Sequence, residues 1–591
     1  MHALRNLLLD GEPELRILDF RSASDIGELQ TECVSAAAWR DISEVRDPSS
    51  GSASPTLCAE QRPQGRTHVL GREGGPRNEA GERSRRHSAG HEDRHVALKC
   101  TRAPPWPESY SCRRYPQFLL SHGMDSTAFD VIRRLGDLLT VQVNSSPELF
   151  AGVEKAAAAV DRGRVKKKTT NEGHGPRKPN LRQLPRAERS PLHITPWDLL
   201  ATFARATTLA RQGRGRGLSE HWQGLKYCRA FAADRHGSLR LTDEGKAPEL
   251  SYRAMQAREL GRAFGLAVAE RALRERYPDH LISIIDAETV LLPGFARTKP
   301  AGTLGARPRP DFLLEVWRPG EASRIFVVTV NGNHQAVKPK TSAGSRTTYR
   351  QLARGSERVE RLHLGQRNET PTLMTSTEFL ATAGVTVHVL HTNGGVELPV
   401  RPRSGAGSAD VAIGRRALPY VDSVAIPTAR GAERHNAFLI PEKEFSWFGR
   451  VVARAHAAGQ LSLAGGGGTV GRYLIDEQGG RHFSETAFAG TASVHDAKVS
   501  FVKERYVGTD QVFRINGTRV EAFSGMATDL YDLLAEGKVE EYRRRAYERQ
   551  RDWPEPDDID DWGASSFRSD GTALAIRVVP KTASPDDRSP G

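Results

Sequence analysis

Two neighbouring apolar segments in the middle of the chain carry polar side chains where a hairpin would bring them together. Asp311 leads into the segment Phe312–Trp317, which contains Glu315, and the segment Ile325–Val330 follows after the turn Pro319–Glu321. In a β-strand, the side chains at positions i and i+2 point to the same face. Acidic side chains gathered in this way can hold a divalent metal ion that activates a water molecule. Asp311 and Glu315 are therefore the residues of this region whose chemistry is considered first.

The Pro310-Asp311 pair and the hairpin after it resemble the PD-(D/E)xK, or restriction-endonuclease-like, superfamily of nucleases. In that superfamily, an Asp at the head of one strand and an acid-x-Lys triplet on the next strand hold the metal ion. The resemblance covers roughly residues 251–391. It implies Mg²⁺ bound by Asp311 and Glu315, with Glu259 or Glu270 on the preceding helix as a further acid.

The chain departs from the superfamily pattern on the second strand. With the apolar strands in register, Thr329 stands at the position of the acid and Asn331 at that of the lysine. Both side chains are neutral, so a magnesium site that needs carboxylates loses one ligand together with the charge of the lysine. Lys338 or Lys340, in the following loop, could replace that lysine. We therefore expect a degenerate nuclease domain that binds DNA or RNA without efficient catalysis; an active Mg²⁺-dependent nuclease with a relocated lysine is an alternative.

The charge of the chain also favours a polyanionic partner. The formal net charge is +13 and the isoelectric point is near 9.6, which is typical of nucleic-acid binding. Arginine-rich composition of the kind found in GC-rich, actinobacterial-type genomes gives the same charge, so a protein-interaction scaffold with no nucleic-acid role is a second alternative. The candidate nucleic-acid contacts are Lys166, Lys167, Lys168, Arg177, Lys178, Arg346, Arg350 and Gln351.

The order of helical and strand-like patterns predicts the fold class. A long amphipathic helix is expected first, then three strands, a second helix and a further strand. This order predicts an α/β fold with a mixed central sheet flanked by helices, of restriction-endonuclease-like type. The expected elements are, in order, Ser251–Arg276, Leu281–Asp286, Phe312–Trp317, Ile325–Val330, Tyr349–Leu362 and Val385–His391.

Shifts in composition suggest five regions. Residues 1–123 are polar and lack an apolar period, so we expect them to be disordered or to precede a true start near Met124. We expect a basic helical region with flexible loops over residues 124–244, and the nuclease-like core over 245–400. An α+β module is expected over 401–552 and a disordered acidic tail over 553–591.

The sequence argues against a membrane span and against a disulfide framework. It contains no run of about 18 apolar residues, the length that a membrane helix needs. The N-terminus lacks the layout of a secretory signal. The five cysteines are scattered and form no CxxC pair. We expect a cytoplasmic protein that does not contact membranes.

Overall fold

The computed structural model describes residues 127–167, 177–209, 220–246, 249–291, 309–335, 344–365, 370–380, 384–400, 420–428, 431–474, 497–554 and 562–579. All of these residues belong to one compact unit. The boundaries expected near residues 244 and 400 therefore do not separate compact units. The disorder expected for residues 1–123 lies outside the described residues.

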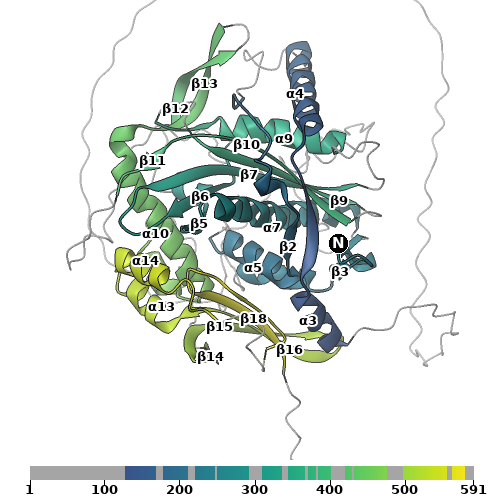
Figure 1. The fold of residues 1–591 in the computed structure, drawn as a ribbon, viewed down its shortest axis with the longest axis vertical. Helices are drawn as coiled ribbons and strands as arrows, with labels where there is room; N and C mark the ends of the chain where they lie inside the picture. The colour runs from purple at the N-terminus through teal and green to yellow at the C-terminus, as the bar shows by residue number, and fades with distance from the viewer. Residues whose placement is uncertain are drawn as a thin grey trace, which may run out of the picture. The chain divides into compact units, whose positions relative to one another are not determined.

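An eight-stranded mixed sheet forms the centre of the fold (Figure 1). Its antiparallel half continues into a parallel pair, because β7 pairs antiparallel with β6 but parallel with β9. The α/β class with a mixed sheet flanked by helices is therefore confirmed. The strand order is β2 (Leu192–Ile194), β1 (Leu139–Asn144), β10 (Gly384–Thr392), β9 (Thr372–Leu380), β7 (Ser323–Gln335), β6 (Phe312–Trp317) and β5 (Leu281–Asp286), with β11 (Glu397–Leu398) on β7.

Two helices cover opposite faces of this sheet at β7. A side chain on Gly261 of α7 (Leu250–Arg276) would collide with the backbone of Asn331, so helix and strand are in close contact there. Gly355 of α9 (Arg346–Val359) lies in the same way against the side chain of Thr329, and α9 in turn packs beside α4 (Pro147–Lys167). The two glycines let both helices approach the strand that carries Thr329 and Asn331.

Strand β9 was not expected from the sequence. Its polar residues hide its strand character, yet all nine residues are buried between β7 and β10. Thr372 is hydrogen-bonded to Thr392 at 2.9 Å, and the Ser376 hydroxyl donates to Gln351 at 2.7 Å. Burial of polar side chains is tolerated when they have such partners.

The C-terminal region forms the expected α+β module. Its sheet has the order β14 (Ala497–Phe501), β15 (Glu504–Ile515), β16 (Thr518–Ala527), β18 (Thr572–Val578) and β17 (Ala564–Phe567). Three helices accompany this sheet: α10 (Phe445–Leu463), α13 (Thr528–Ala535) and α14 (Val539–Glu548).

The prediction of a disordered tail over residues 553–591 is wrong for Ala564–Phe567 and Thr572–Val578, which form β17 and β18. The apolar residues Leu574 and Ile576 are buried, and β18 pairs with β16 from Val578 to Thr572. Acidic residues dominate the composition just upstream and mask this short apolar segment. Residues 555–561 and 580–591 lie outside the described part.

Shorter elements complete the described chain. They are α3 (Ala128–Gly136), α5 (Pro196–Thr207), β3 (Phe231–Ala233), β4 (Leu239–Leu241), α6 (Asp243–Lys246), α8 (Ala287–Leu291), β8 (Leu362–Leu364), β12 (Tyr420–Thr428), β13 (Gly431–Ile440) and α11 (Gly467–Gly471), with 3₁₀ turns at Ala187–Arg189, Glu220–Tyr227 and Glu442–Glu444. Within the described ranges, no helix is both long enough and apolar enough to cross a membrane.

Candidate functional site

Asp311 lies at the head of β6, as expected, and its carboxylate is held by a guanidinium. The backbone N–H of Val330 donates to Oδ2 at 2.9 Å, and Nη1 of Arg358 donates to Oδ1 at 2.8 Å. The other arm of Arg358, Nη2, donates to Oδ1 of Asn331 at 3.2 Å. One arginine of α9 thus bridges the two residues that the resemblance places at a metal ion and a catalytic lysine.

Glu315, the second expected metal ligand, lies far from Asp311. The two residues are four positions apart on an extended strand, which corresponds to about 14 Å. Glu315 is fully buried and accepts two hydrogen bonds from Arg543 of α14, at 2.9 and 3.2 Å. The pair ties the central sheet to the C-terminal module and leaves Glu315 unavailable to a metal ion at Asp311.

Glu259 also points to other partners. It accepts a short hydrogen bond from the Tyr227 hydroxyl and lies 2.7 Å from the amine of Lys226. In the described part of the chain, no group of three or more His, Cys, Asp or Glu side chains could hold a metal ion. The described residues therefore do not fit the expected Mg²⁺ site. Lys338 and Lys340 lie outside them.

A further acidic residue lies on the strand next to the one headed by Asp311 and was not predicted from the sequence. Asp286, at the end of β5, pairs in register with Phe312, the residue after Asp311. Burial and the nearby carboxylate of Glu288 raise the pKa of Asp286 to about 6, although Arg262 and Arg309 act to lower it. Its position at the end of a strand next to the one headed by Asp311 was the signal that could have revealed it.

Two arginines of α7 approach the same end of the sheet. Arg258 and Arg262 are one helical turn apart, on either side of Gly261, which touches the backbone of Asn331. The like charge of Arg262 is the main cause that lowers the pKa of Arg258, while Asp311 acts to raise it. Arginines from both faces of the sheet therefore surround the strand ends at Asp311.

The exposed side of α9 carries a row of arginines. Arg346, Arg350 and Arg354 are exposed and spaced four residues apart, and Arg358 continues this spacing towards Asp311. Successive members are about 6 Å apart along the helix axis. The acid on this part of the helix, Glu357, is bound by Arg164 of α4 at 2.7 Å. The row therefore presents positive charge to solvent.

The other expected nucleic-acid contacts do not join this row. Gln351 faces the sheet, where its amide donates to the carbonyl of Gly332 at 2.9 Å. Lys178 is buried, and Arg177 forms an ion pair with Asp161. Lys166 and Lys167 lie in the last turn of α4, but their side chains, like all of Lys168, are outside the described part.

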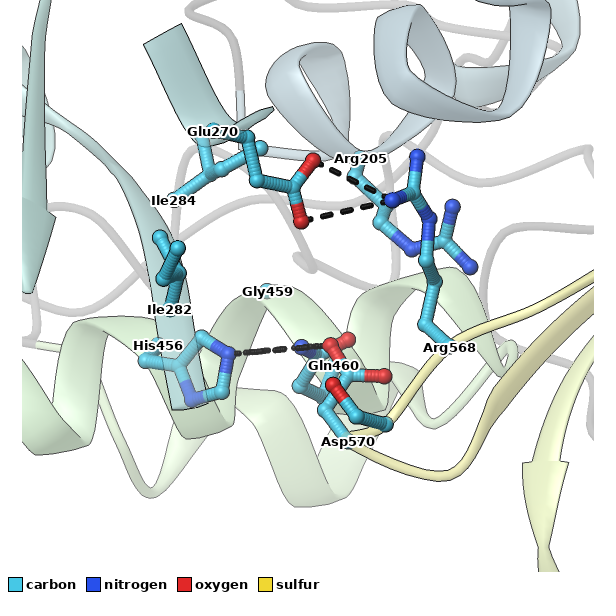
Figure 2. Close-up of a pocket in the computed structure, with 10 residues that line it drawn as sticks. Arg205, Glu270, Ile282, Ile284, His456, Gly459, Gln460, Arg568 and Asp570 are labelled. Atoms are coloured by element: carbon cyan, nitrogen blue, oxygen red, sulfur yellow. Dashed lines mark hydrogen bonds and ion pairs between the residues drawn. The ribbon is translucent and has the colours of Figure 1, made fainter. Parts of the chain in front are cut away.

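A separate cavity of about 30 Å³ lies between α7, β5, α10 and the turn joining β17 to β18 (Figure 2). Nη1 of Arg568 lies 3.1 Å from Oε2 of Glu270. Burial acts to raise the pKa of Glu270, but the charges of Arg274 and Arg568 outweigh it and lower the pKa. Gln460 donates to Asp570 at 2.6 Å. This volume suits one or two water molecules. These two contacts tie α7, α10 and the β17–β18 turn together around the cavity.

The chain matches no protein-family profile, no curated protein and no solved structure.

Proposed function

We propose that this chain binds DNA or RNA through a nuclease-like domain that does not cleave it. The observation that carries the proposal is the guanidinium of Arg358 between Asp311 and Asn331. A permanently charged guanidinium neutralises the carboxylate that would otherwise bind a divalent cation. The order of α7, three antiparallel strands, α9 and the parallel strand β9 supports the resemblance to a degenerate PD-(D/E)xK domain.

The arginine row of α9 supplies a surface for the nucleic acid. Arg346, Arg350 and Arg354 are exposed on the side of α9 that ends at Arg358. Arginines bind phosphate oxygens through charge-assisted hydrogen bonds. Neutralised phosphates release counterions, so binding to this row would weaken steeply as the salt concentration rises.

The test is binding of the full chain to labelled DNA and RNA over a series of salt concentrations, with and without Mg²⁺ or Mn²⁺. We expect salt-sensitive binding, no cleavage, and a salt slope reduced by about 2 in Arg350→Ala/Arg354→Ala, since each arginine that binds a phosphate adds about 1 to the slope. The matched control is Arg544→Ala/Arg545→Ala, which removes the same charge from exposed positions on α14.

Three outcomes decide between the alternatives. Metal-dependent cleavage that is lost in Asp311→Ala would replace the proposal with an active nuclease. No binding even at low salt would leave the protein-interaction scaffold. An equal loss of binding in the α14 control would mean that net charge alone, and not the arginine row, attracts the nucleic acid.

A further inference from the structure

We propose that Arg258, Arg262 and Arg358 form a phosphate-binding site at the strand ends beside Asp311. The inference deepens the proposed function, because it names the chemical group that this part of the fold receives. The phosphate would come from a nucleic-acid strand or from a free phosphorylated molecule, and both present the same tetrahedral oxyanion.

Two of these arginines are unpaired within the part of the chain that the structure describes. Among the described residues, neither Arg258 nor Arg262 forms a hydrogen bond or an ion pair. They lie one helical turn apart, where like charges destabilise a helix. Arg262 is half-buried, so its charge is partly removed from water, and the carboxylate of Asp286 acts on it without forming an ion pair. An anion between the two side chains would relieve both costs.

Three elements, α7, β7 and α9, converge on one position at Asn331. Gly261 of α7 lies against the backbone of Asn331 in β7, and this contact places the helical turn that carries Arg258 and Arg262 beside that strand. Arg358 reaches the side chain of Asn331 from α9, on the opposite face of the sheet. Guanidinium groups arriving from two helices can surround an oxyanion, which a single helix cannot do.

The charged groups around this position leave an excess of positive charge. Arg309 is paired with Glu288, and Arg358 with Asp311. Asp286 remains as the carboxylate near Arg262. The excess of positive charge suits an anion and disfavours a second cation, so the site would bind the phosphate directly rather than through a metal ion.

The experiment measures the midpoint of thermal unfolding of the full chain in increasing inorganic phosphate, with chloride at matched ionic strength as the reference. Ligands that bind the folded state raise this midpoint. We expect a saturable rise with phosphate, and an affinity reduced by about tenfold or more in Arg258→Gln/Arg262→Gln, which loses charge-assisted hydrogen bonds. Arg258→Lys/Arg262→Lys, which keeps the charge, should retain part of the rise, and Arg544→Gln/Arg545→Gln on α14 should retain all of it.

Oligonucleotides with and without a terminal phosphate separate the two sources. Stronger binding of the phosphorylated strand that depends on Arg258 and Arg262 would support a nucleic-acid phosphate. A response to inorganic phosphate alone, with no oligonucleotide bound at any salt concentration, would support the site and a free phosphorylated ligand while refuting the proposed function.

The inference itself would be overturned by an unchanged phosphate response in Arg258→Gln/Arg262→Gln, or by a chloride response equal to that of phosphate. Salt-sensitive nucleic-acid binding through α9 would still stand in either case. Circular dichroism of each variant confirms that its fold is intact before the comparison is made.

Discussion

Glu315 of β6 and Arg543 of α14 form a fully buried ion pair, and the guanidinium stacks 3.7 Å from the centre of the Trp317 ring. The glutamate that was predicted as a metal ligand therefore connects the central sheet to helix α14. Removing one partner of such a pair leaves an unpaired charge in the interior, which costs far more than the pair itself contributes.

We therefore expect Glu315→Ala to lower the free energy of unfolding by about 3 to 5 kcal/mol. Urea denaturation of the single variant and of Glu315→Leu/Arg543→Met measures the effect. The double variant should recover most of the loss, because it removes both charges. A single variant as stable as the wild type would contradict the structural role of Glu315.

Because Arg358 bridges Asp311 and Asn331, we expect divalent metal ions to change neither the stability nor the activity of the protein. Mg²⁺ and Mn²⁺ should neither raise the midpoint of thermal unfolding nor promote cleavage, since Asp311 is already neutralised by the guanidinium. Asp311→Asn is the matched variant and should behave like the wild type towards both ions. A metal-induced stabilisation present in the wild type and lost in Asp311→Asn would show instead that the carboxylate binds metal.

The raised pKa of Asp286 predicts that this residue destabilises the fold above pH 6. Burial and Glu288 raise the pKa from 3.8 to about 6, so the folded state holds its proton more tightly than the unfolded state does. The resulting cost is absent below pH 4, grows as the pH rises from 4 to 6, and reaches about 3 kcal/mol above that window. Asp286→Asn should therefore raise the unfolding free energy at pH 7.5 and leave it unchanged at pH 4. Equal effects at the two pH values would argue against the shift.

Glu378 predicts the opposite dependence on pH. Burial acts to raise its pKa, but hydrogen bonds from His388, Ser345 and Thr348 outweigh burial and lower the pKa to about 2. Its ionised form thus stabilises the fold above the unfolded-state pKa near 4.5, and this contribution is lost as the pH falls towards 2. Glu378→Gln should cost about 3 kcal/mol at neutral pH and progressively less in acid. Denaturation of both proteins between pH 3 and pH 7 tests this trend.

Glu378 also connects stability with the proposed binding surface. Its Oε1 accepts from the N–H of Ser345, the cap of α9, at 2.7 Å and from the hydroxyl of Thr348 at 2.6 Å. Where Glu378→Gln still folds, we expect weaker nucleic-acid binding, because the start of α9 loses its anchor. Unchanged binding would show that α9 is positioned by its packing alone.

The sequence predicted the hairpin well because its strands follow simple apolar patterns. The bounds of β5 and β6 agree with the expected segments, and α7 begins one residue before the expected helix. Strand β9 was not predicted, because the hydrogen-bond partners of its Thr, Ser and Glu side chains are distant in sequence. Such partners exist only after folding, so no local pattern can reveal them.

The candidate site was predicted in position but not in composition. Asp311 lies at the head of β6 as expected, but Thr329 and Asn331 lie inside β7, which continues to Gln335 instead of ending at Val330. Arg358, which bridges two residues of the site, lies in α9, 27 residues after Asn331 in the sequence. Its role depends on the angle at which α9 crosses the sheet, and spacing along the chain does not specify that angle.

Strand β18 is translated long after α5, the helix that it contacts. The indole N–H of Trp197 in α5 donates to the carbonyl of Leu574, 377 residues later, and Arg568 pairs with Glu270 of α7 across 298 residues. While the ribosome is still translating the module, α5 and α7 are already outside the exit tunnel with their partner surfaces uncovered. Contacts so distant along the chain close slowly. These surfaces of α5 and α7 should therefore stay uncovered until β17 and β18 have been translated.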